Sequence, residues 1–116
     1  QAFRTALNRF GQIQRYIGDG YAMTAAAKCL VYQVARDIGP DIRNRVGSDA
    51  AKLFAAPVGK TVADYAMQVL GGAGYCKEFP VERLWRDAKL LEIGGGTIEA
   101  HQKNLTKDLT EIMLGR

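Results

Sequence analysis

Two glycine clusters are the residues of this sequence that could contact a ligand through their backbone: Gly71-Gly72-Ala73-Gly74 and Gly94-Gly95-Gly96. One glycine is enough to end a helix, and each further glycine adds conformational entropy that folding must overcome. Runs of this kind often let a ligand or a second backbone approach closely. The second cluster leads into Thr97 at an expected helix N-terminus, where free N–H groups and the helix dipole favour an anion. Helix termination and ligand contact both remain open for these clusters.

The second cluster is not a known nucleotide motif. A phosphate-binding Walker loop would continue with Lys-Ser or Lys-Thr, and this cluster does not. A dinucleotide fingerprint would follow a strand, and no strand is expected before this cluster.

The remaining reactive side chains form no catalytic or metal-binding set. His101 is the single histidine and is expected to be a solvated residue of the last helix. Cys29 and Cys76 are far apart without a CxxC partner, so no metal site is expected. Cys29 lies in an apolar stretch and is expected in the core, and neither thiol is expected to be functional. This cysteine usage indicates a reducing compartment.

The elements that must position the glycine clusters are helices. A first helix is predicted to end at Gly39-Pro40. After a loop over residues 41–47, Ser48 is predicted to cap a second helix, which bends at Pro57 and stops at Gly71-Gly72. The apolar positions at helical spacing are Phe10, Ile13, Ile17, Ala27, Leu30, Val31, Val34 and Ile38 in the first helix, and Ala51, Phe54, Ala55, Val58, Val62, Tyr65, Ala66 and Val69 in the second.

Two shorter helices follow a loop over residues 75–79. Pro80 suits the first turn of a helix that runs to Arg86 or Lys89. Arg86 and Asp87 are expected to form an ion-pair network under Trp85. Thr97 is predicted to cap the last helix, which Gly115 closes, with an apolar face of Ile98, Leu105, Leu109, Ile112 and Met113. No segment alternates with period two, so the predicted fold is all-α, an antiparallel four-helix up-and-down bundle.

Composition agrees with a single helical domain over residues 1–116. Hydrophobic residues make up 47% and charged residues 24% of the 116 residues, which is typical of globular domains. The net charge of +4 is spread along the chain, so nucleic-acid binding is not expected. No apolar run approaches the roughly 20 residues of a membrane span, and no signal peptide is expected. The first residue is Gln1 and not Met, which indicates a processed chain or a fragment.

The motifs identify a family. Gln68-Val69-Leu70-Gly71-Gly72-Ala73-Gly74-Tyr75, Phe79-Pro80-Val81-Glu82-Arg83, Arg86-Asp87-Ala88-Lys89 and Ile93-Gly94-Gly95-Gly96-Thr97 follow in this order. Together they closely resemble the C-terminal helical domain of the acyl-CoA dehydrogenase family. The upstream segments Ile13-Gln14, Ile17-Gly18-Asp19 and Ala51-Lys52-Leu53-Phe54-Ala55 also resemble it, so the resemblance covers nearly the whole chain.

The resemblance implies an FAD-dependent enzyme that oxidises an acyl-CoA thioester to the trans-2-enoyl-CoA and passes electrons to an electron-transfer flavoprotein. A carboxylate removes the α-proton while hydride passes from the β-carbon to the flavin. The complete subunit has an N-terminal helical domain, a middle β domain and this bundle, which makes most contacts of a homo-oligomer, a dimer or tetramer. The expected location is the bacterial cytoplasm or the mitochondrial matrix, and the isolated chain is expected to be inactive.

The resemblance also assigns roles to particular residues. Gly96 matches a residue at the substrate thioester. The expected FAD contacts are Gln68, Val69, Leu70, Gly71 and Gly72, which match a segment that meets FAD from a neighbouring subunit, and Thr97, Ile98 and Glu99.

This sequence departs from the family at one decisive position. Many members have Glu-Gly-Thr where this chain has Gly95-Gly96-Thr97. That Glu is their catalytic base, so no catalytic residue is expected in this chain. In the isovaleryl and long-chain branches the base lies on an earlier helix, which would precede Gln1. The alternatives are a non-catalytic helical partner subunit that only assembles, and an unrelated helical interaction module.

Overall fold

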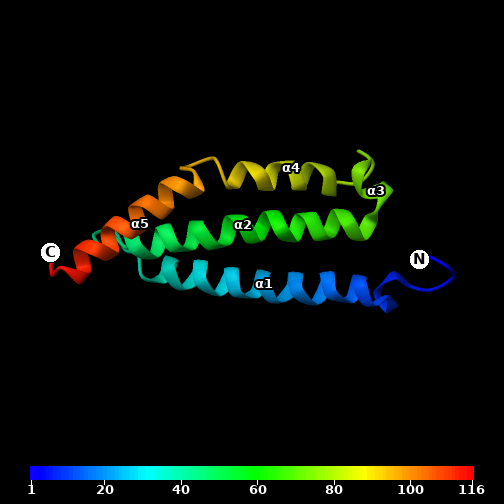
Figure 1. Ribbon diagram of the computed structural model, residues 1–116, viewed down its shortest axis with the longest axis horizontal. Coiled ribbons are helices and arrows are strands. Elements are labelled where there is room, and N and C mark those ends of the chain that lie inside the picture. The colour runs from blue at the N-terminus through cyan, green and yellow to red at the C-terminus, as the bar shows by residue number, and fades with distance from the viewer.

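The computed structural model describes residues 1–116 and contains helices only, which confirms the all-α prediction (Figure 1). The elements are the short 3-10 helix η1 (Leu7–Arg9) and the α-helices α1 (Gly11–Arg36), α2 (Arg45–Leu70), α3 (Gly72–Tyr75), α4 (Val81–Leu91) and α5 (Ile98–Met113). Only two isolated bridges, Ala2 with Thr5 and Gly39 with Ile42, resemble strand pairing. No helix is both long enough and apolar enough to span a membrane.

The central element is α2. The antiparallel helix α1 packs along one side of it, and α4 followed by α5 packs along the other (Figure 1). The helices therefore form an open row, 63 Å long and 25 Å across. Because α2 contacts each of the other long helices, it determines how α1, α4 and α5 are placed relative to one another.

Close packing between α1 and α2 centres on small and aromatic residues. Gly20 is buried, and a Cβ at this position would lie 3.8 Å from the Tyr65 ring. The rings of Tyr16 and Tyr65 lie 4.9 Å apart at 39°, within the range of favourable tilted pairs. The expectation that Cys29 lies in the core is wrong, because its side chain points to the exposed side of α1.

The start of α2 differs from the prediction. Asn44, and not Ser48, is the N-cap, because its Oδ1 accepts a hydrogen bond from the Gly47 N–H at 2.8 Å. The helix runs unbroken through Pro57. It ends, as predicted, at Gly71, whose φ of +61° is a conformation that glycine adopts without a Cβ clash.

The second half of the chain contains one element that the sequence did not predict, the single turn α3. Its residue Gly74 is buried, and a Cβ there would meet the Met67 carbonyl oxygen at 2.6 Å. After Pro80, α4 begins at Val81 and extends two residues beyond Lys89, to Leu91.

The ion pairs around Trp85 also differ from the prediction. Arg86 pairs with Glu82 at 3.0 Å and not with Asp87, and this hydrogen bond to Glu82 raises the pKa of Arg86. The Trp85 indole N–H donates to Asp64 at 3.0 Å, and the Lys60 ammonium lies 3.7 Å from the centre of the Trp85 ring. Trp85 is therefore held by α2, which fixes α4 against it.

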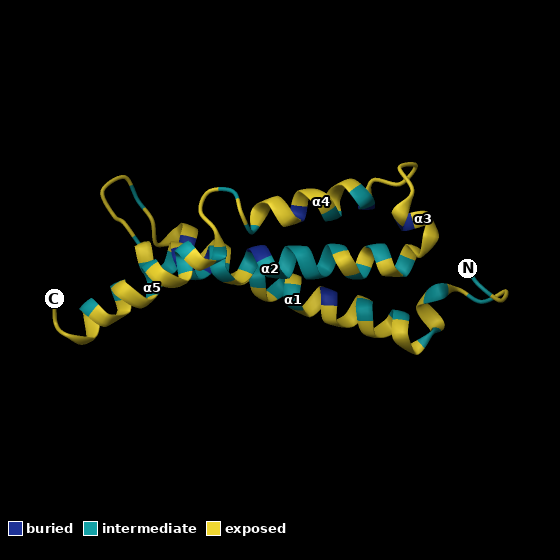
Figure 2. Cartoon of the chain, turned by 45° about the horizontal axis from the view of Figure 1, so that its top comes forward, coloured by how far each residue is buried: buried dark blue, intermediate teal, exposed yellow.

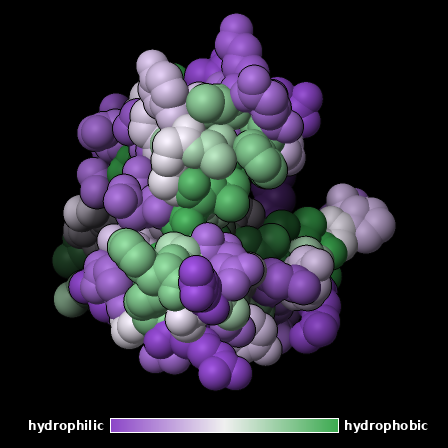
Figure 3. Space-filling model, turned by 90° about the vertical axis from the view of Figure 1, so that its right-hand side faces the viewer, coloured by the Kyte–Doolittle hydropathy of each residue, from purple (hydrophilic) through white to green (hydrophobic).

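Few side chains are fully buried in this row of helices. Eight of the 116 residues are buried, and exposed positions run along every helix (Figure 2). Seen end on, hydrophobic side chains reach the surface between polar ones (Figure 3). The exposed apolar positions on α4, α5 and the end of the chain include Leu84, Leu90, Leu91, Leu109, Ile112, Met113 and Leu114.

Candidate functional site

The turn between α4 and α5 is built from the second glycine cluster. At its start the Gly94 N–H donates to the Leu90 carbonyl at 2.7 Å, and at its end the Ile98 N–H donates to the Glu92 carbonyl at 3.2 Å. Gly95 and Gly96 have φ values of +71° and +107°. Residues with a Cβ are strained in this region, so the backbone path favours glycine at both positions.

This turn presents free hydrogen-bond donors. The N–H groups of Gly95, Gly96 and Thr97 donate to no protein group. The Thr97 Oγ1 accepts a hydrogen bond from the Ala100 N–H at 3.2 Å, which confirms Thr97 as the N-cap of α5. The three donors therefore stand at the positive end of a helix, where an anion or a carbonyl oxygen is favoured.

Two side chains of α2 contact the turn or the residue packed against it. The Lys52 ammonium donates to the Gly94 carbonyl at 2.8 Å. One helical turn earlier, a carboxylate oxygen of the buried Asp49 lies 2.6 Å from Nδ1 of His101. The expectation that His101 is solvated is therefore wrong, because only 15% of its side chain is exposed.

The histidine ring fills the space beside Gly96. A Cβ at Gly96 would lie 2.9 Å from the His101 Nε2 atom. That nitrogen is buried and has no hydrogen-bond partner in the protein. The sequence reasoning missed Asp49 and Lys52, whose spacing of three residues on one helix was the available signal.

The first glycine cluster forms a separate backbone surface at the end of α2. A Cβ at Gly71 or Gly72 would meet nothing within 4 Å, so both backbones are open to approach. The Gly72 N–H donates to no protein group, and Gln68 is exposed. An open cleft of about 820 Å³ lies beside this surface and is lined by residues that include Met67, Tyr75 and Trp85.

The structure gathers the predicted site residues into two groups. Gly96, Thr97, Ile98 and Glu99 lie together at the start of α5, whereas residues 68–72 lie at the far end of α2 (Figure 1). The 11 residues of α4 separate the two groups, a length of about 16 Å at 1.5 Å per residue. One copy of the chain therefore does not bring the two groups into one site.

Comparison with known proteins decides the family. The family described as "Acyl-CoA dehydrogenase, C-terminal domain" matches residues 1–110. The chain belongs to the acyl-CoA dehydrogenase family.

Several relatives resemble nearly the whole chain. Mitochondrial isovaleryl-CoA dehydrogenase of Oryza sativa subsp. japonica is 38% identical over 94% of this chain and 27% of its own length. The short-chain specific acyl-CoA dehydrogenase of Clostridium acetobutylicum is 37% identical over 86% of this chain and 26% of its own length. Acryloyl-CoA reductase (NADH) of Anaerotignum propionicum is 39% identical over 84% of this chain and 25% of its own length. The chain thus spans about a quarter of the curated relatives it matches.

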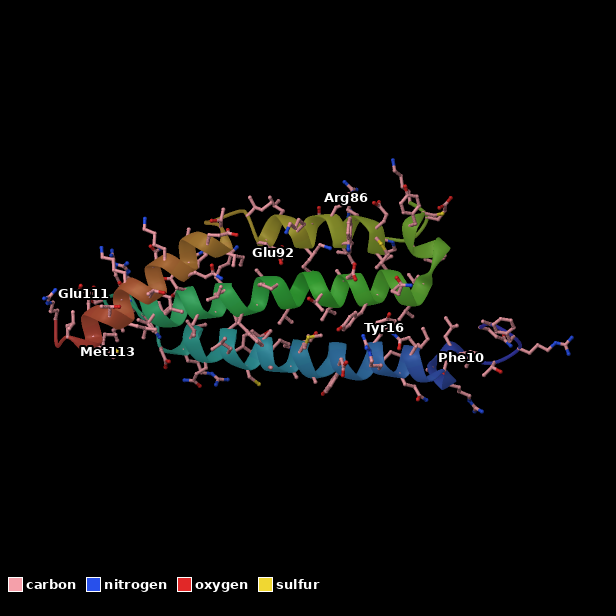
Figure 4. The ribbon with its side chains drawn as sticks, viewed as in Figure 1. Phe10, Tyr16, Arg86, Glu92, Glu111 and Met113 are labelled. Carbon is pink, nitrogen blue, oxygen red and sulfur yellow. The ribbon has the colours of Figure 1, made fainter.

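This member of the acyl-CoA dehydrogenase family carries no carboxylate at position 95. A Cβ built on Gly95 meets nothing within 4 Å, so the space beside it is open. Glu92 lies at the end of α4 beside the turn (Figure 4). Its carboxylate pairs with Lys89 at 2.6 Å. Glu99 is exposed in the first turn of α5.

Proposed function

We propose that this chain is the C-terminal helical domain of an FAD-dependent enzyme that oxidises acyl-CoA to trans-2-enoyl-CoA, where it contributes FAD contacts and an oligomer interface. The observation that carries the proposal is the set of free N–H groups at Gly95, Gly96 and Thr97. The resemblance to the family implies that Gly96 lies at the substrate thioester, and the donors suit that role.

On the substrate side, the turn would bind the thioester carbonyl oxygen. A hydrogen bond from the turn to that oxygen stabilises the negative charge that develops when the α-proton leaves. Donors that are already held in place need no reorganisation during the reaction. The open space at Gly95 leaves room for a base supplied by another part of the enzyme.

On the cofactor side, both groups of residues fit FAD chemically. Thr97, Ile98 and Glu99 would contact FAD near the substrate, and Gln68, Val69, Leu70, Gly71 and Gly72 would contact its pyrophosphate and adenine side. The open backbones of Gly71 and Gly72 and the free Gly72 N–H suit close approach of an anionic group. When bound, FAD supplies the hydride acceptor.

The separation of the two groups supports a site shared between subunits. Because α4 holds residues 68–72 and 96–99 apart, each group would serve a different FAD in a dimer or tetramer. The N-terminal and middle domains of the same protein would complete each site, and an electron-transfer flavoprotein would receive the electrons. Relatives include mitochondrial and bacterial proteins, in line with a mitochondrial matrix or bacterial cytoplasmic location.

One observation favours a second candidate function, a non-catalytic partner subunit. The absence of a side chain at Gly95 removes the base that many family members carry there. A protein that has lost the base without a replacement could still assemble with other subunits.

The experiment that separates the two functions uses the complete protein that contains this chain. After purification, we expect an absorption band of bound flavin and acyl-CoA-dependent reduction of an artificial electron acceptor. The same preparation without acyl-CoA is the control for substrate-independent reduction. A folded oligomer that holds no flavin and reduces no acceptor with any acyl-CoA of short, long or branched chain would contradict the enzyme and support the partner subunit.

A further inference from the structure

The contacts beneath the α4–α5 turn lead to an inference that rests on the proposed function and names residues to which no role has been assigned. We propose that Asp49 and His101, together with Lys52, are positioning residues. They hold the Gly94–Thr97 turn in the one conformation that directs its free N–H groups at the thioester carbonyl.

The turn needs external support because of its composition. Three consecutive glycines, Gly94 to Gly96, have more accessible backbone conformations than any other residues. A hydrogen-bond donor helps a reaction only when it is already in place, and a displacement of about 1 Å can cost about 100-fold in rate. The turn's own hydrogen bonds close its two ends, at Gly94 and Ile98, and leave the middle unbonded.

The support comes from one face of α2. Lys52 fixes the carbonyl of Gly94, at the start of the turn, through a 2.8 Å hydrogen bond. Asp49 fixes the His101 ring through a 2.6 Å contact at Nδ1, and the ring lies against Gly96 at the other end. Asp49 and Lys52 lie three residues apart on one face of a long, regular helix. They therefore keep the two ends of the α4–α5 turn at a fixed distance from each other.

The chemistry of the pair indicates more than space filling. Burial of a carboxylate costs free energy unless it is paired, and an apolar pair of similar volume would pack at this position without that cost. An Nδ1–H donated to Asp49 fixes the orientation of the imidazole ring and directs Nε2 toward Gly96. The pair thus determines where the ring lies, and the ring determines where Gly96 can lie.

The kinetic test uses the complete flavin-loaded enzyme. We expect Asp49→Ala and His101→Ala each to lower kcat/KM for acyl-CoA by about 10- to 100-fold while flavin content stays unchanged. The double variant should be no worse than either single variant, because the two residues act as a unit. His101→Asn keeps a donor near the Nδ1 position and should recover part of the loss. Gln102→Ala, at an exposed neighbouring position on α5, is the matched control and should behave as the wild type.

A second measurement does not depend on activity. The Gly94 and Ile98 amides are hydrogen-bonded at the two ends of the turn, so their hydrogen exchange reports whether the turn opens. We expect exchange at both amides to accelerate in Asp49→Ala, His101→Ala and Lys52→Met and to stay unchanged in Gln102→Ala. A general loss of fold would instead accelerate exchange throughout α2, so amides in the middle of that helix serve as the internal reference.

The outcomes separate the inference from the proposed function. Wild-type kinetics in Asp49→Ala and His101→Ala, in an enzyme that holds flavin and turns over, overturn the inference and leave the proposed function standing. A wild type that holds no flavin overturns the proposed function, and unchanged exchange at Gly94 and Ile98 then overturns the inference as well. Loss of turnover by about 10⁴-fold in His101→Asn, at unchanged substrate affinity, would make His101 a catalytic base and would also contradict a positioning role.

Discussion

Gly95 shows how the backbone of one residue can restrict its chemistry. Its φ of +71° is a conformation in which a residue with a Cβ is strained by roughly 1–2 kcal/mol. A glutamate at this position would therefore need either that strain or a different turn. The space beside Gly95 would hold a side chain, so it is the positive φ alone that favours glycine in this turn.

The first prediction at this scale concerns the catalytic base. Glu92 is paired with Lys89 and Glu99 is exposed on α5, so neither is expected to replace the missing carboxylate. In the complete enzyme, Glu92→Gln and Glu99→Gln should each lower kcat by less than about tenfold, whereas removal of a general base costs about 10²–10⁴-fold. Steady-state turnover with flavin content measured in parallel is the check.

The control for this experiment is the same substitution at the Asp and Glu residues of the other domains of the complete enzyme. Changed singly to the amide, one of them should abolish turnover without loss of flavin. If instead Glu92→Gln or Glu99→Gln lowers turnover by orders of magnitude in a flavin-loaded enzyme, the prediction that this chain supplies no base is wrong.

At the scale of the residue, the sequence predicted the roles of the glycines and helix caps better than the contacts of the side chains around the α4–α5 turn. The glycine runs, Thr97 as a cap and Gly71 as a terminator are local features that a short window of sequence contains. The pairing of Asp49 with His101 joins residues 52 positions apart, and no periodicity carries that information. A single histidine on a helix is most simply solvated, and only the packing of α5 on α2 makes it half-buried.

At the scale of the element, helix ends depend on caps. The Asn44 side chain accepts from the Gly47 N–H, whereas Ser48 lies inside the helix. We predict that Asn44→Ala lowers the free energy of unfolding by about 1 kcal/mol, the usual contribution of an N-cap. Urea unfolding followed by circular dichroism at 222 nm measures the difference.

The matched control is Ser48→Ala, which should change the free energy of unfolding by no more than about 0.5 kcal/mol. The opposite order, with Ser48→Ala the more costly substitution, would contradict the cap that the structure assigns.

The elements show which sequence signals are sufficient. Amphipathic periods predicted α1, α2 and α5, and Pro80 predicted the start of α4. The start of α2 was missed because Asn44 and Ser48 are both good N-cap residues, and the sequence alone does not choose between them. The helix α3 was missed because its four residues lie within a run of glycines, a composition that more often indicates a turn.

At the scale of the whole molecule, the chain exposes more surface than a compact monomer of the same mass would. Its accessible surface is 8400 Å² for 12.7 kDa, against about 6200 Å² expected for a compact monomer of that mass. The radius of gyration is 17.9 Å, against about 13.4 Å expected. The excess includes many large apolar side chains, such as Leu90 at 61% and Met113 at 87% exposure.

We therefore predict that the chain by itself self-associates. Large exposed apolar side chains in this number are typical of surfaces that contact other domains or subunits. Light scattering after size-exclusion chromatography should give a mass at least twice 12.7 kDa at high concentration, and circular dichroism should show a helical spectrum. Leu90→Lys with Leu109→Lys should shift the equilibrium toward the monomer, and Arg83→Lys, a charge-conserving change at an exposed site on α4, is the control.

A monomer at all concentrations would contradict this prediction, and a spectrum rich in β-structure would contradict the fold itself.

The unbroken length of α2 has a consequence for changes in chain length. Each residue of an α-helix turns the chain by about 100° and advances it by 1.5 Å. Deletion of one residue between Lys52 and Gln68 would therefore rotate one glycine turn about the helix axis relative to the other. The connection over residues 37–44, with its single bridge between Gly39 and Ile42, can absorb an inserted or deleted residue. The connection before Arg45 should thus accept insertions and deletions, whereas α2 should tolerate exchange of residue types but not of residue number.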